Sequence, residues 1–119
     1  MSKLGRYAAD RKKIKELTAA HTVSVAECGT YFMLNSATEF AVTLPNASDA
    51  GSGWWARFYV VAAPSGADYT VVATAGDGDN MHGVVLSAED AAGSGDSTGG
   101  TAVDVINFEN GKAKQGDFV

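Results

Sequence analysis

The sequence has few of the residues that cross-link a chain, kink it or carry acid–base chemistry. It contains one cysteine (Cys28), two prolines and two histidines in 119 residues. A single cysteine excludes an internal disulfide, which fits a reducing compartment. Long apolar runs are also missing, because none approaches the roughly 20 residues of a membrane-spanning helix. The first 16 residues lack the hydrophobic centre of a signal peptide. We therefore expect a chain made in a cytoplasm, with no membrane partner.

The composition is that of a globular protein. Hydrophobic residues make up 45% of the chain and charged residues 19%, which excludes a largely disordered polypeptide. A chain of this length normally forms one domain with one modest core.

The charges are distributed unevenly along the chain. The net charge is −5, yet residues 1–16 carry six basic and two acidic side chains, whereas the rest carries three basic and twelve acidic ones. We therefore divide the chain into a basic N-terminal arm, residues 1–17, and a β-rich domain, residues 18–119. Two interpretations of the arm stay open: a contact with an anionic partner, or a solvated terminus. Its pattern allows a short helix over residues 8–16, which only docking would stabilise.

Beyond the arm, the pattern predicts an all-β fold. Short apolar or alternating runs recur about every ten residues, with glycine-rich turns between them and no helical period. The segment 38–45 alternates, with Phe40, Val42 and Leu44 on one face. We predict a small antiparallel β-sandwich or barrel, jelly-roll-like, with an extended basic N-terminal arm. The predicted strands are 21–25, 30–35, 38–45, 54–62, 68–73, 81–86 and 101–109, and the main loops are 46–53, 63–67, 76–80 and 88–100.

The strand over residues 54–62, WWARFYVVA, has two different faces. One face is wholly apolar and is predicted to lie in the core. The other carries Trp55, Arg57 and Tyr59, residue types that are enriched at protein–protein contacts. Two interpretations stay open: these three side chains form a subunit interface, or they cap the core with the arginine stacked between the rings.

Catalytic and ligand-binding motifs are weak. No nucleophile elbow, phosphate-binding loop or dinucleotide motif is present. The histidines His21 and His82 leave a hydrolase conceivable, and an acidic loop at residues 77–80 offers oxygen atoms but lacks the other ligands of a calcium site. We expect no enzyme activity, no cofactor and no bound metal. Nucleic acid is not expected either, because the body is acidic and shows no stacking motif.

The succession TVSVAECGTYFMLNSATEFAVTLP, then WWARFYVV, then DYTVVATAGDGDNMHGVV, resembles the head decoration (cement) proteins of tailed bacteriophages. The resemblance covers roughly residues 18–119. It rests on Gly29 with Phe32 and Leu34, on Thr43-Leu44-Pro45, on Gly53 and Phe58, and on Gly83. Similar chains continue past a Gly-Asp-aromatic-Val segment into a closing hairpin. Two arrangements of the last strand are therefore left open: pairing with a neighbouring subunit, or an unpaired edge.

The resemblance implies a structural protein of the virion that assembles in the host cytoplasm and is located on the outer capsid surface. It would bind the major capsid protein across joints between capsomers, and a homo-oligomer is implied, with a trimer favoured. The arm would supply the capsid contacts, which are Lys3, Leu4, Arg6, Tyr7, Arg11, Lys12, Lys13, Ile14 and Lys15. One alternative is a tail-fibre or receptor-binding module that uses loops 46–53 and 88–100.

Overall fold

The computed structural model describes residues 12–36, 38–74, 81–87 and 96–119, with only the backbone described over 82–87 and 96–103. This part of the chain is mostly strands with almost no helix, as the all-β prediction requires. The elements are β1 (Lys13–Leu17), β2 (His21–Thr22), the 3₁₀ helix η1 (Val25–Glu27), β3 (Thr30–Leu34), β4 (Ala41–Thr43), α2 (Ala47–Ala50), β5 (Ala56–Val60), β6 (Tyr69–Val72), β7 (Met81–Ser87), β8 (Asp96–Val103) and β9 (Val105–Phe108). None of the helices in the described ranges is long and apolar enough to cross a membrane.

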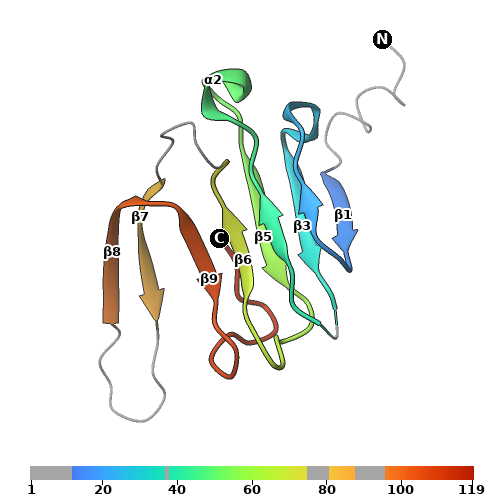
Figure 1. Ribbon diagram of the computed structural model, residues 1–119, viewed down its shortest axis with the longest axis vertical. Coiled ribbons are helices and arrows are strands. Elements are labelled where there is room, and N and C mark those ends of the chain that lie inside the picture. Colours follow the sequence, from blue (N-terminus) through green and yellow to red (C-terminus); the bar gives the residue numbers. More distant parts are fainter. Residues whose placement is uncertain (1–11, 37, 75–80, 88–95) are drawn as a thin grey trace.

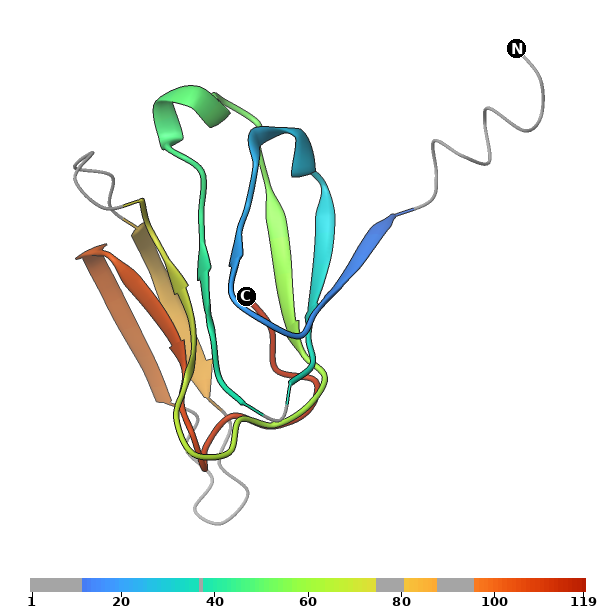
Figure 2. The same ribbon diagram turned by 45° about the vertical axis from the view of Figure 1, so that its right-hand side comes forward.

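The strands form three open sheets (Figures 1 and 2). The first sheet has the order β1-β3-β5, the second β2-β4-β6-β9, and the third is the β7-β8 pair. From β1 to β6 the chain alternates between the first and second sheets, so each sheet receives every second strand. Successive strands within one sheet run in the same direction, so all four strand pairs among β1 to β6 are parallel.

The predicted antiparallel arrangement is therefore wrong for these four pairs. Antiparallel neighbours are normally joined by a tight hairpin, whereas parallel neighbours need a crossover. Here the crossover is the strand placed in the other sheet. Antiparallel pairing holds for β6 with β9 and for β7 with β8. None of the described sheets closes into a barrel.

One core receives side chains from both main sheets. In β3 buried residues alternate with half-buried ones, and Phe32 and Leu34 are fully buried. Phe32 is in register with Phe58 of β5, and their rings stack with centroids 5.2 Å apart. The second sheet adds Val42, Tyr69 and Val71. The predicted alternation of segment 38–45 is confirmed, since Phe40 and Val42 are buried and Leu44 packs against the core.

Several predicted element boundaries were wrong. The segment 101–109 is not one strand, because the chain bends at Asp104 between β8 and β9. Residues 96–100, predicted as loop, belong to β8. The predicted loop 46–53 contains the one-turn helix α2. The Asn46 side chain caps its N-terminus by accepting a hydrogen bond of 2.9 Å from the Ser48 N–H.

Residues 116–119 cover the free edge of β5. The Phe58 N–H donates to the Val119 carbonyl (2.8 Å), the Val119 N–H donates back (3.0 Å), and the Val60 N–H donates to the Asp117 carbonyl (2.8 Å). The pairing is antiparallel, with Tyr59 opposite Phe118. The pairing left open at the C-terminal segment is therefore made within the chain itself, and β1 remains as an edge strand of the first sheet.

Candidate functional site

The side of the first sheet that faces away from the core carries aromatic side chains. Because neighbouring strands are in register, Ile14, Tyr31 and Arg57 form one row across the sheet, and Glu16, Met33 and Tyr59 form the next. Trp55 comes before β5, and Phe118 lies opposite Tyr59. We call this surface the outer face and define it by Lys12, Ile14, Tyr31, Met33, Trp55, Arg57, Tyr59 and Phe118.

The aromatic rings of the outer face contact one another in a line. Trp55 meets Tyr31 edge to face (5.8 Å between centroids), Tyr31 stacks on Tyr59 (5.7 Å), and Tyr59 stacks on Phe118 (5.5 Å). The rings therefore form one continuous aromatic surface, of the residue types that are enriched at contacts with other proteins.

Two cations lie among these rings. The Arg57 guanidinium lies 5.9 Å from the centre of the Tyr31 ring and donates a hydrogen bond of 3.5 Å to the Tyr59 hydroxyl. This hydrogen bond raises the pKa of Arg57. Lys12 Nζ lies 6.0 Å from the centre of the Trp55 ring. Within the described ranges, neither cation has a carboxylate at ion-pair distance.

The outer face is open to solvent and slightly hollowed. Ile14 is 68% exposed, Phe118 63% and Trp55 40%. A shallow depression of about 350 Å³ lies over β3, and it is lined by Lys12, Ile14, Tyr31, Met33 and Tyr59. Apolar bulk of this kind on one face is typical of an interaction surface.

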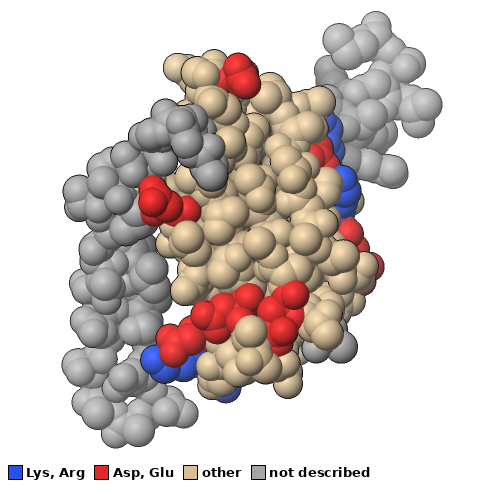
Figure 3. Space-filling view, viewed as in Figure 1, with Lys and Arg blue, Asp and Glu red and all other residues tan. Residues whose placement is uncertain are grey.

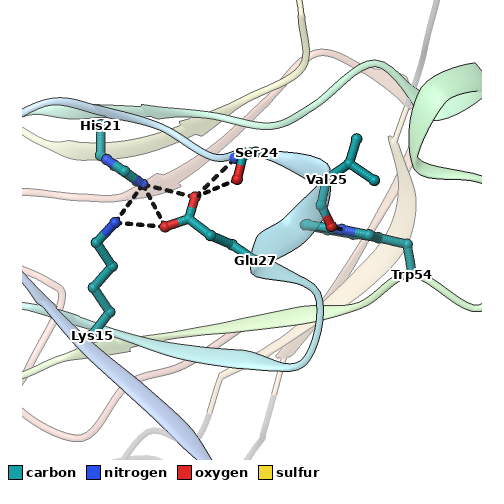
Figure 4. A network of polar contacts seen from close by, with 6 residues as sticks. All are labelled: Lys15, His21, Ser24, Val25, Glu27 and Trp54. Atoms are coloured by element: carbon teal, nitrogen blue, oxygen red, sulfur yellow. Dashed lines mark hydrogen bonds and ion pairs between the residues drawn. The ribbon is translucent and has the colours of Figure 1, made fainter.

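A polar cluster ties β1 to the body of the domain (Figure 4). The Glu27 carboxylate of η1 accepts hydrogen bonds from Lys15 Nζ (2.5 Å) and from the Ser24 N–H (2.8 Å), and it lies 3.1 Å from His21 Nε2. On the other side of β1, the Asn35 side chain donates to Glu16 (2.6 Å). These two contacts fix an edge strand that is otherwise exposed.

The Glu27 carboxylate is strongly stabilised in its charged form. Desolvation acts to raise its pKa, but the hydrogen bonds from Lys15, Ser24 and His21 outweigh it and lower the pKa to about 2. The cluster does not form a Ser-His pair, since the Ser24 hydroxyl donates to Glu27 (3.4 Å). His21 Nε2 lies 3.3 Å from Lys15 Nζ and 3.1 Å from Glu27 Oε2, and as the donor to Glu27 it does not also accept from Lys15. This arrangement is that of a structural ion pair.

The structure brings together part of the predicted site. Trp55, Arg57 and Tyr59 share one face, as the alternation predicted, while Phe58 and Val60 on the opposite face are buried. Of the predicted arm contacts, Lys13, Ile14 and Lys15 lie on β1, and Lys12 directly precedes it. The short helix allowed over residues 8–16 is therefore wrong for residues 13–16, which are a strand. Lys3, Leu4, Arg6, Tyr7 and Arg11 lie outside the described residues, as do the acidic loop 77–80 and the side chain of His82.

Sequence reasoning missed Tyr31, Met33 and Phe118 as members of the outer face. The four central residues of the run TYFMLN are all apolar or aromatic, so its pattern does not show which residues face out. The pairing of Phe118 with β5 joins residues distant in the sequence, which no local pattern reports. Across the described ranges, no three His, Cys, Asp or Glu side chains are grouped to hold a metal ion. Comparison of the chain with protein-family models, curated proteins and solved structures finds no match.

Proposed function

We propose that the chain is a structural protein of a phage virion that binds the outer surface of the assembled capsid and stabilises it across joints between capsomers. The observation that carries this proposal is the exposed cationic edge at β1, which we define by Lys12, Lys13, Ile14 and Lys15. All four side chains are exposed. The resemblance to decoration proteins, stated above, supports the same proposal.

The cationic edge suits contact with an acidic partner. In the sequence it follows Lys3, Arg6 and Arg11 of an otherwise acidic chain, and it lies on an open sheet edge that the Lys15–Glu27 ion pair fixes. Lysine and arginine clusters steer association with surfaces of opposite charge, and Ile14 adds exposed apolar area. A cement protein needs no catalytic activity. Because it binds the assembled shell and not the separate subunits, it shifts the assembly equilibrium toward the shell.

The test measures occupancy of capsids that were prepared without the protein. The structure shows where the truncation must stop: Lys13–Leu17 pair with β3, so only residues 1–11 can be removed without opening the first sheet. We expect this truncated protein to occupy capsids at least about tenfold less at equal concentration, because it loses the three cations Lys3, Arg6 and Arg11. K12Q/K13Q, which neutralises two exposed lysines of the cationic edge itself, should also lower occupancy.

The matched control neutralises cations elsewhere, as K112Q/K114Q. Both lysines are exposed and lie far along the chain from the cationic edge, so their loss is expected to leave occupancy within about twofold. Equal occupancy for the truncated and the full chain would remove residues 1–11 from the mechanism. Failure of the full chain to bind any capsid surface would overturn the proposal itself.

A further inference from the structure

The outer face has the composition of an interface but no partner within the described chain. Tyrosine, tryptophan and arginine contribute disproportionately to binding free energy at protein contacts. Trp55, Arg57 and Tyr59 are joined here by the exposed Phe118 and Ile14. A partner for this face must cover apolar rings and place negative charge near Arg57 and Lys12.

The same chain carries a surface of that charge, the acidic band. We define it by Glu39, Asp68 and Glu109. Figure 3 shows a run of acidic side chains across the lower part of the molecule. The three lie close together: the charge of Asp68 acts on Glu39, and Asp68 accepts a 2.8 Å hydrogen bond from the N–H of Asn110, the residue after Glu109. Backbone N–H groups, of Ala67 first, lower the pKa of Glu39, so it stays charged.

The two surfaces lie at opposite ends of the first sheet. Tyr31 and Trp55 are at the start of β3 and directly before β5, whereas Glu39 and Asp68 follow the far ends of these two parallel strands. A five-residue strand spans roughly 15 Å. One copy therefore presents aromatic rings with cations at one end and carboxylates at the other.

We infer that copies of this chain associate head to tail, with the Trp55–Arg57 end of the outer face of one copy contacting the acidic band of the next. The outer face carries one carboxylate of its own, Glu16, which already accepts a hydrogen bond from Asn35. Packing the outer face against itself would therefore bring together Arg57 and Lys12 of both copies with no carboxylate that is not already hydrogen-bonded, and like charges oppose such a contact. A head-to-tail contact joins two different surfaces. Its repetition builds a closed ring if the rotation between neighbouring copies leads back to the first copy, and an open filament if it does not.

The test is sedimentation velocity of the full chain at low salt over a range of concentrations, and it needs no capsid. We expect concentration-dependent association that R57E weakens at least about tenfold and that D68K weakens similarly. The double variant R57E/D68K restores opposite charges across the contact, and we expect its association to return to within about threefold of the original. D104K makes the same charge change as D68K at an exposed residue between β8 and β9, outside both surfaces, and should leave association unchanged.

Folding is checked by thermal unfolding of every variant. Because Asp68 accepts a backbone hydrogen bond, E109K at the exposed Glu109 serves as a second band variant with less structural cost. A chain that stays monomeric up to about 1 mM would overturn the inference. So would unchanged association in all the single variants, or a double variant no better than they are. These outcomes leave capsid occupancy as a separate measurement, so the two proposals can fail independently.

Discussion

At the scale of single residues, Glu27 shows how one carboxylate fixes an exposed strand. It accepts from a side chain of β1 and from the backbone of its own turn, and it contacts the imidazole of β2. Exposed ion pairs contribute little to stability, whereas a carboxylate with several donors contributes more. The side chain of Glu27 is only 20% exposed, which places it between these two cases.

We predict that E27Q lowers the free energy of unfolding at pH 7 by about 1 kcal/mol, since part of the contribution is lost to solvent screening. The pKa of Glu27 is lowered from 4.5 to about 2 in the folded chain. Its contribution is therefore fully present above pH 4.5 and is lost as the pH falls toward 2. Denaturant titrations at several pH values should show a shallower acid dependence for E27Q. The control is E109Q, whose ion pair with Lys112 is exposed; an equal effect in both variants would contradict the assignment.

At the scale of elements, alternation within a strand was predictable and strand direction was not. The faces of segments 38–45 and 54–62 follow from period-two patterns, because successive side chains of a strand point to opposite faces of the sheet. Whether the next strand pairs with its predecessor or crosses to another sheet depends on contacts between distant residues. The sequence therefore indicated Trp55, Arg57 and Tyr59 as an outward face, but not the parallel order that places Tyr31 and Ile14 beside them.

Two adjacent residues of β3 test the faces of this strand. Phe32 is 0% exposed and stacks on Phe58, whereas Tyr31 lies on the outer face. We predict that F32A costs about 3–5 kcal/mol, because it leaves a cavity in the core. Y31A should cost less than about 1.5 kcal/mol, the loss of ring contacts at a surface. Chemical denaturation of both variants measures the difference, and similar costs would mean that the faces are assigned wrongly.

At the scale of the whole molecule, charge is separated between a cationic edge and an acidic remainder. Electrostatic attraction between surfaces weakens once the Debye length, about 10 Å at 0.1 M salt, falls below their separation. Binding through the cationic edge should therefore depend strongly on ionic strength.

We predict that raising the salt from about 0.05 to 0.5 M lowers the association rate with capsids at least about tenfold. The truncated chain that lacks residues 1–11 should show a smaller salt dependence, since fewer cations take part. Surface plasmon resonance on immobilised capsids measures both rates. A rate independent of salt would show that apolar contacts, and not the cationic edge, govern the encounter.

The alternation of strands between the two sheets also constrains how the chain reaches its native state. Residues 30–34 pair with 56–60, so this ladder cannot form until more than twenty intervening residues have been brought together. Closing a loop of that length costs conformational entropy before the first hydrogen bonds between these strands can form. Folding dominated by such distant partners is slow, on the order of milliseconds to seconds. Newly made copies therefore expose unpaired strands for that interval.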